Sequence, residues 1–126
     1  MGQLVVVIED DTDILGIMRD ALEADGYGVV SITHPVQLHT LEQGIAPDLF
    51  LIDVMLQERS GIELAYELRR KGFGASPMIA MSASRLLAGA ASGVGIFDDV
   101  MDKPFSLAQL LECVQLHTGK LALAES

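Results

Sequence analysis

The chain has 126 residues, half of them hydrophobic, with 18 acidic against 8 basic side chains and a formal net charge of −10. This composition predicts one folded domain rather than a disordered chain. The acidic balance weighs against direct nucleic-acid binding, which needs a basic face. No apolar run approaches the roughly 18–20 residues of a membrane span, and the N-terminus lacks the basic start of a signal peptide. We therefore expect a cytoplasmic domain, in which the single Cys113 is a reduced core thiol.

The first half of the chain alternates between predicted strands and helices. A strand at 4–8 precedes a helix over about 13–25, which ends at Gly26. A second strand at 28–32 leads to a helix of about ten residues that starts at Pro35 and ends at Gly44. A third strand at 49–52 is apolar without alternation, as in a strand buried on both faces of a parallel sheet.

The second half continues the same pattern. A helix over 60–72 is followed by a strand at 77–81, a glycine-rich helix over 84–95 and a strand at 96–101. The last helix, 106–118, starts with Ser106 as N-cap and Gln109 in a capping box. Strands that alternate with helices of this length predict a parallel sheet covered on both faces. We expect a single doubly wound α/β domain with strand order 2-1-3-4-5. Its core would be residues 3–118, and 119–126 would be a tail or the start of a linker.

Polar residues follow four of the predicted strands at their carboxyl ends. Acids follow the first strand at 9–11, and Asp53, Ser82 and Lys103 follow the third, fourth and fifth. Because these ends meet at one edge of a parallel sheet, the side chains are expected to share one cleft. Carboxylate ligands favour a hard cation such as Mg²⁺. A carboxylate nucleophile beside a lysine and a hydroxyl is typical of phosphoryl transfer. Alone, the acids at 9–11 and Ser82 also fit a helix start or cap, and Lys103 fits a solvated loop. Asp53 is harder to explain structurally, because it ends a strand inside the sheet.

Four segments carry a resemblance to a known family. "VVVIEDDTDIL", "LFLIDVMLQERSGIEL", "MIAMSAS" and "MDKPFS" resemble, in order and spacing, the conserved segments of response regulator receiver domains. The likeness covers about residues 3–118 and implies the flavodoxin-like, CheY-like (βα)5 fold. It also implies that Asp53 is phosphorylated and that Lys103 pairs with the phosphoryl group. Asp10 and Asp53 would bind Mg²⁺ or Mn²⁺, with Glu9 acting through water and Met55 through its backbone carbonyl.

The resemblance assigns further positions, and two of them depart from the family pattern. Ser82 would hydrogen-bond the phosphoryl group, and Ala83 matches the small residue above it. Val100 stands where an aromatic switch residue is expected, and Gln57 stands where the family usually has a proline, so the loop after Asp53 is expected to be less rigid.

The function implied is that of a phosphoacceptor in a two-component phosphorelay. The donor would be a sensor histidine kinase or a histidine phosphotransfer protein. The domain would catalyse only its own phosphorylation and dephosphorylation. Phosphorylation would change the conformation of a face made of helix 84–95, strand 96–101 and the last helix. The domain would also form a homodimer through this face. Two alternatives stay open: a Mg²⁺-dependent phosphatase with an aspartyl-phosphate intermediate, and a pseudo-receiver that only binds or dimerises.

Overall fold

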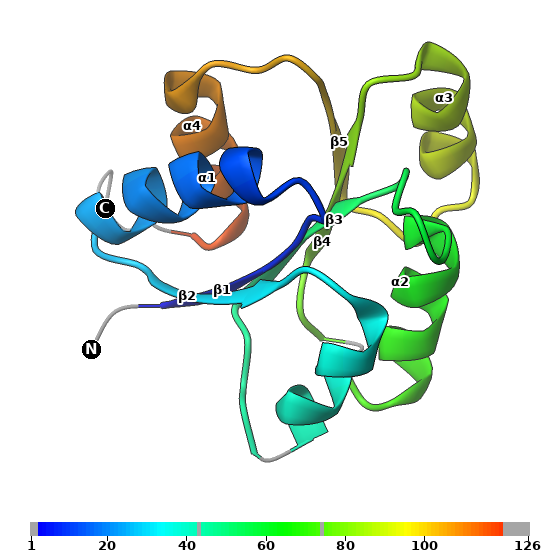
Figure 1. Ribbon diagram of the computed structural model, residues 1–126, viewed down its shortest axis with the longest axis horizontal. Coiled ribbons are helices and arrows are strands. Elements are labelled where there is room, and N and C mark those ends of the chain that lie inside the picture. Colours follow the sequence, from blue (N-terminus) through cyan, green and yellow to red (C-terminus); the bar gives the residue numbers. More distant parts are fainter. Residues whose placement is uncertain (1–2, 43, 74, 120–126) are drawn as a thin grey trace.

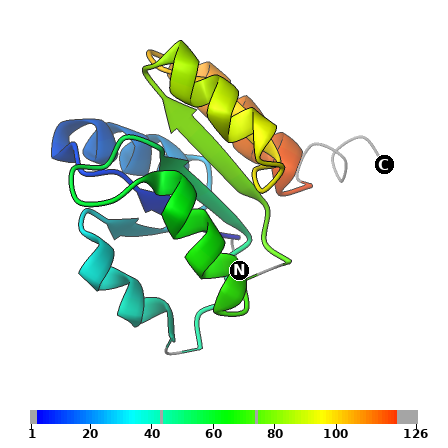
Figure 2. The same ribbon diagram turned by 90° about the vertical axis from the view of Figure 1, so that its right-hand side faces the viewer.

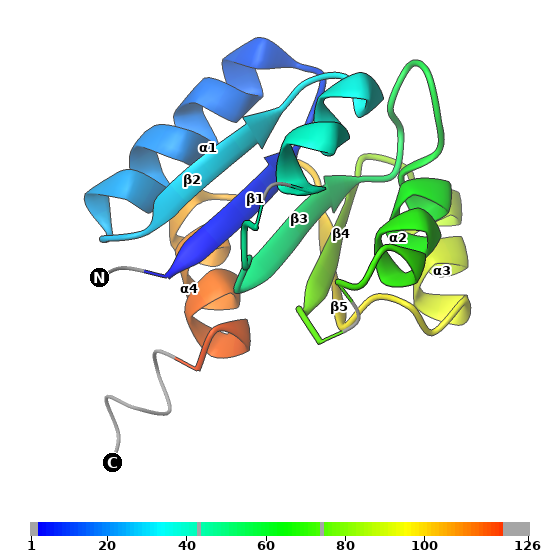
Figure 3. The same cartoon turned by 90° about the horizontal axis from the view of Figure 1, so that it is seen from below.

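The computed structural model describes residues 3–42, 44–73 and 75–119, and within them five parallel strands form one sheet in the order β2-β1-β3-β4-β5 (Figure 3). This confirms the predicted doubly wound α/β fold. In chain order the elements are β1 (Leu4–Ile8), α1 (Thr12–Ala24), β2 (Gly28–Ile32), the 3₁₀ helix η1 (Pro35–Glu42), β3 (Leu49–Asp53), α2 (Gly61–Arg70), β4 (Met78–Ser82), α3 (Arg85–Gly93), β5 (Asp99–Asp102) and α4 (Leu107–His117).

Helices cover both faces of the sheet (Figures 1 and 2). On one face Leu49 and Leu51 of β3 belong to a buried cluster that also holds residues of α1 and α4. On the other face Phe50 and Ile52 pack with residues of η1 and α2. Because successive side chains of a strand point to opposite faces, both faces of β3 must be apolar, which explains its unbroken hydrophobic run. The strand that carries Asp53 is thus held rigidly between two helical layers.

The sequence predicts a helix of about ten residues after β2, and the structure shows that this segment is the 3₁₀ helix η1. A 3₁₀ helix is wound more tightly than an α-helix. Leu38 and Leu41 are the buried residues here, at 3% and 2% exposure, and they are spaced by three. A 3₁₀ helix has three residues per turn, so this spacing places both side chains on one face against the sheet. The Gln37 side chain also accepts hydrogen bonds from the backbone N–H groups of Thr33 and His34, which fixes the start of the helix.

Two strands begin later than the sequence predicts. β4 begins at Met78 rather than at Pro77, and β5 covers Asp99–Asp102 rather than 96–101. Ile96 and Phe97 are apolar because they pack against the cluster under α2, not because they belong to the strand. Asp98 lies between this apolar pair and β5, and its side chain accepts a hydrogen bond of 2.8 Å from the Met78 N–H. Residues 120–126, most of the predicted tail, lie outside the described residues.

The helix starts agree with the sequence. Asp11 caps α1 by accepting hydrogen bonds from the N–H groups of Asp13 and Ile14. Ser106 and Gln109 form the predicted capping box of α4. Among the residues that the structure describes, no helix is long and apolar enough to cross a bilayer.

Candidate functional site

Three carboxylates gather where β1 and β3 end. The two strands are hydrogen-bonded neighbours, with Ile8 opposite Ile52, so Glu9, Asp10 and Asp53 emerge at the same point of the sheet edge. One carboxylate oxygen from each lies within 4.8 Å of the others. Three negative groups this close repel one another unless a cation lies among them. The all-oxygen donor set fits a hard divalent ion such as Mg²⁺.

Asp53 is held at both of its carboxylate oxygens. Its Oδ2 accepts a hydrogen bond of 2.9 Å from Lys103 Nζ, and its Oδ1 accepts one of 2.9 Å from the Met55 N–H. The residue is only 5% exposed. The contact with Lys103 joins residues 50 positions apart in the chain. Asp53 and Lys103 thus meet as the resemblance implies.

Glu9 is fully buried and hydrogen-bonds the same lysine. Burial, together with the neighbouring Asp53 carboxylate, raises the pKa of Glu9 to about 7. Burial alone would lower the pKa of Lys103, but its hydrogen bonds to Glu9 and Asp53 outweigh that effect and raise it. Above a pH of about 7 both groups are charged, and the lysine offsets part of the repulsion between the two acids.

The loop after β3 is attached to Asp10 through its backbone. The N–H of Gln57 donates a hydrogen bond of 2.8 Å to Oδ2 of Asp10, a half-buried residue. A proline at position 57 would have no N–H to donate. The lower rigidity expected for this loop stays a prediction, and the structure adds a hydrogen bond to Asp10 that a proline at position 57 could not make.

A glycine in α2 permits the close approach of that helix to the end of β3. A Cβ atom placed on Gly61 would lie 2.1 Å from the carbonyl oxygen of Asp53 and 2.8 Å from the Cα of Val54. The Gly61 N–H also donates to the Val54 carbonyl at 3.1 Å. Gly61 is therefore a positioning residue for Asp53. Sequence reasoning missed it, although a glycine at the start of a predicted helix was a signal for close packing.

Ser82 and Ala83 lie at the carboxyl end of β4, beside the acidic cluster. The Ser82 hydroxyl is buried and donates to the Ser84 carbonyl at 2.9 Å, while it accepts from the Ser84 N–H at 3.1 Å. It is thus engaged within its own turn, and its contact with a phosphoryl group stays a prediction. Val100 packs against a small cluster that contains Val54, Ala80 and Ala91.

Comparison with known proteins identifies the family. Residues 5–115 match the model of the response regulator receiver domain. The chain belongs to this family. It is 36% identical over 115 residues to the nisin biosynthesis regulatory protein NisR of Lactococcus lactis, and 32% identical over 124 residues to the phosphate regulon transcriptional regulatory protein PhoB of Pseudomonas aeruginosa. These alignments cover 88% and 94% of the chain but 48% and 54% of the relatives. The receiver domain thus spans about half the length of the curated relatives it matches.

Solved structures agree on the fold of this receiver domain. A CheY-like receiver domain protein from Methanospirillum hungatei superposes with a TM-score of 0.84 at 22% identity, covering 95% of this chain and 96% of that one. The response regulator TrrA from Thermotoga maritima, solved in complex with Mg²⁺ and BeF, gives a TM-score of 0.78 at 22% identity, covering 91% and 98%. At such low identity these matches concern the fold alone.

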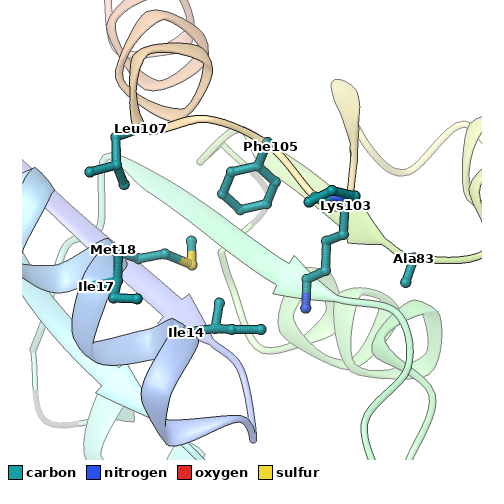
Figure 4. A pocket seen from close by; sticks show the side chains of 8 residues that line it. Ile14, Ile17, Met18, Ala83, Lys103, Phe105 and Leu107 are labelled. Atoms are coloured by element: carbon teal, nitrogen blue, oxygen red, sulfur yellow. The ribbon is translucent and has the colours of Figure 1, made fainter.

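The receiver domain also has an apolar hollow beside Lys103, which sequence reasoning missed. Its volume is about 390 Å³, and Figure 4 shows Ile14, Ile17 and Met18 of α1 facing Phe105 and Leu107 across it. Ile17 is 56% and Leu107 46% exposed. The signal in the sequence was the pair Ile14 and Ile17, which places apolar side chains on α1 at helical spacing next to the acidic pocket.

Proposed function

We propose that this receiver domain accepts a phosphoryl group on Asp53 from a phosphohistidine of a sensor histidine kinase or a histidine phosphotransfer protein. The observation that carries the proposal is the arrangement around Asp53. A nearly buried carboxylate lies within hydrogen-bond distance of Lys103, and a Glu9 and an Asp10 oxygen lie within 4.8 Å. This arrangement is typical of phosphoryl-transfer sites, in which the protein positions the reacting groups and offers positive charge to the phosphoryl oxygens.

The reaction joins one oxygen of Asp53 to phosphorus and breaks the bond between phosphorus and the imidazole nitrogen of the donor. The product is an acyl phosphate, and the released imidazole takes up a proton from water. Lys103, which already contacts Asp53, would pair with an oxygen of the transferred group. Rigid mounting on β3 keeps the nucleophile in line, because both faces of the strand are packed.

Mg²⁺ or Mn²⁺ would be held by Asp10 and Asp53, by Glu9 through water and by the backbone carbonyl of Met55. The ion would neutralise the charge that gathers on the phosphoryl oxygens. The all-oxygen donor set supports this assignment. Among the described residues, Lys103 is the cation that pairs with both Glu9 and Asp53, and it offsets part of their charge.

The apolar hollow beside the site supports a protein as the phosphate donor. Ile17 and Leu107 are large exposed apolar side chains that line this hollow, and Lys103 lines it too. A partner protein that covered this hollow would bury both side chains. The formal net charge of −10 supports an output through protein contacts rather than direct nucleic-acid binding.

Phosphorylation would then shift the equilibrium between two states of the α3–β5–α4 face, where a homodimer is also expected. Ser82 would leave Ser84 and bond the phosphoryl group. Because Val100 has no aromatic ring, the usual coupling to a ring rotamer does not operate, and movement of α3 against β5 would carry the signal. A cytoplasmic location completes the proposal, since the free thiol of Cys113 stays reduced there.

The test is incubation with a small phosphate donor, acetyl phosphate, and Mg²⁺, followed by intact-mass measurement. We expect one phosphate per chain on the wild type, sensitive to hydroxylamine as an acyl phosphate is, and none on Asp53→Asn. Asp20→Asn, which removes an exposed acid on α1, is the matched control and should be phosphorylated like the wild type. Equal labelling of Asp53→Asn and wild type would refute the proposal. Rapid turnover of p-nitrophenyl phosphate would instead favour an aspartyl-phosphate phosphatase.

A further inference from the structure

A second group of potential metal ligands includes the first residue of β5, at the opposite end of that strand from Lys103 and the acidic cluster. Asp99 begins β5, while Cys113 and His117 lie four residues apart on α4. Residues at this spacing share one face of a helix. Each offers one donor atom, and the oxygen, sulfur and nitrogen all lie within 4.8 Å of one another. We propose that Asp99, Cys113 and His117 form a binding site for a divalent transition metal of the Zn²⁺ type, distinct from the Mg²⁺ pocket.

The distances fit a tetrahedral ion. Usual bond lengths to Zn²⁺ place sulfur and oxygen ligands about 3.6 Å apart and nitrogen and oxygen ligands about 3.4 Å apart. Cys113 Sγ lies 3.7 Å from Asp99 Oδ2, and His117 Nε2 lies 2.9 Å from the same oxygen. Of these two pairs, the first already matches and the second has to open by about 0.5 Å to admit an ion.

The donor set selects the kind of metal. A thiolate, an imidazole and one carboxylate together favour Zn²⁺ over Mg²⁺, which prefers oxygen ligands and octahedral geometry. Three protein ligands leave a fourth tetrahedral position for water or another ligand. The site therefore differs in chemistry from the cluster of Glu9, Asp10 and Asp53, which offers oxygen alone.

The three ligands differ in how deeply they are buried. Cys113 is 9% exposed and packs in the core between the sheet and α4. The side chains of His117 and Asp99 are 19% and 44% exposed. A hollow of about 320 Å³ runs along β5 and α4 and is lined by both Asp99 and Cys113. An ion can thus enter from the solvent on the Asp99 side and meet the thiol at the bottom.

The Asp99 carboxylate supplies a negative charge for a cation, whereas the Cys113 thiol has to lose its proton first. Burial by itself would raise the pKa of Asp99, but its hydrogen bonds with His117 and the Val100 N–H outweigh that effect and lower it, so the carboxylate is ionised. Burial, followed by the nearby Asp99 charge, raises the pKa of the Cys113 thiol to about 12. Metal binding would displace the thiol proton, as a bound Zn²⁺ does, and the ion would take the place of that proton beside Asp99.

Such an ion would join α4 to the start of the edge strand. β5 runs from Asp99 to Asp102 and is followed by Lys103, which contacts Asp53. The metal would therefore anchor the end of β5 that lies away from Asp53. We expect this cross-link to raise the unfolding temperature, because a ligand that binds only the folded chain stabilises it.

The test is titration of the untagged, reduced chain with Co²⁺ in saturating Mg²⁺, followed by displacement with Zn²⁺. We expect one Co²⁺ per chain, a thiolate-to-cobalt absorption band in the near ultraviolet, and a higher unfolding temperature with Zn²⁺. Cys113→Ser should abolish the band. His117→Gln and Asp99→Asn should weaken binding by at least about a hundredfold, since even changes behind a ligand cost about 10–100-fold.

Two controls make the result specific. His39→Gln removes an exposed histidine on η1, and Asp53→Asn removes the phosphoacceptor and a ligand of the Mg²⁺ pocket; both should keep the thiolate-to-cobalt band at wild-type affinity. Absence of the band in the folded wild type would overturn the proposal. So would unchanged affinity in His117→Gln and Asp99→Asn, or an equal loss in either control. The Asp53→Asn control separates this result from the phosphotransfer proposal.

Discussion

Replacement of Gly61 by alanine tests how tightly α2 is packed against the phosphoacceptor strand. The added Cβ would meet the backbone of Asp53 and Val54, with contacts of 2.1 Å to the Asp53 carbonyl oxygen and 2.8 Å to its carbon. Backbone atoms cannot rotate away as a flexible side chain can. The start of α2 and the end of β3 must therefore separate, and the Asp53 carboxylate must move with its backbone.

The magnitude follows from that distance. Ordinary contact begins near 3.4 Å, so the two segments must move apart by about 1.3 Å. Overpacking of a well-packed site costs about 1–3 kcal/mol, and a rigid backbone neighbour places this case at the upper end. The lower chain entropy of unfolded alanine returns about 0.4–1 kcal/mol. We expect a net loss of about 2–2.6 kcal/mol in the free energy of unfolding, or roughly 10 °C in unfolding temperature, and slower phosphorylation of Asp53.

Urea denaturation followed by circular dichroism measures the first effect, and intact-mass kinetics with acetyl phosphate measures the second. Gly16→Ala and Gly89→Ala are matched controls, because an added Cβ at either position meets nothing within 4 Å. Each should stabilise its helix by about 0.5–1 kcal/mol. The reasoning is refuted if Gly61→Ala is as stable as these controls and is phosphorylated at the wild-type rate.

Three further predictions concern charge and titration. Arg69→Ala should lower the free energy of unfolding by about 3 kcal/mol, because the Arg69 guanidinium donates to three backbone carbonyls at 2.8 to 3.2 Å. Replacement of the exposed Arg70 by alanine should change it by less than about 0.5 kcal/mol. Equal urea midpoints for the two variants would contradict this. With a pKa of about 12 instead of 9.0, Cys113 in the metal-free native chain should react with iodoacetamide at pH 8 about 1000-fold more slowly than in the unfolded chain, and a comparable rate would show a normal thiol. In metal-free buffer, folded Glu9 keeps its proton up to a pH of about 7, while the unfolded residue loses it near 4.5, so its contribution to stability falls as the pH rises through that range. Urea titrations should show this loss in wild type relative to Glu9→Gln, and parallel pH profiles would argue against it.

The strands, their order and the main site could be predicted from the sequence because each depends on a repeating or terminal feature of the chain. Unbroken apolar runs identify buried strands, and alternation with helices implies parallel pairing. Parallel pairing then places Glu9, Asp10, Asp53 and Lys103 at one edge, where the structure finds them together. The fold and these four positions therefore follow from periodicity, chain order and handedness.

The remaining features depend on distances that a linear pattern does not encode. The close approach at Gly61 is set by where α2 lands on β3, and the hydrogen bond from Gln57 to Asp10 is set by the path of a loop. The start of β5 was predicted wrongly because packing under α2 and strand pairing both favour apolar residues.

Tertiary structure alone also decided what surrounds Cys113. In the sequence it is one thiol in an apolar helical pattern, which predicts a core residue and nothing more. In the fold it contacts Asp99, which is 14 residues away in the chain and lies on another element. His117 shares its helix face, but only the docking of α4 on β5 brings the carboxylate to both. Short-range patterns determine which elements form and which faces are buried, whereas a ligand set drawn from two elements exists only after those elements have packed.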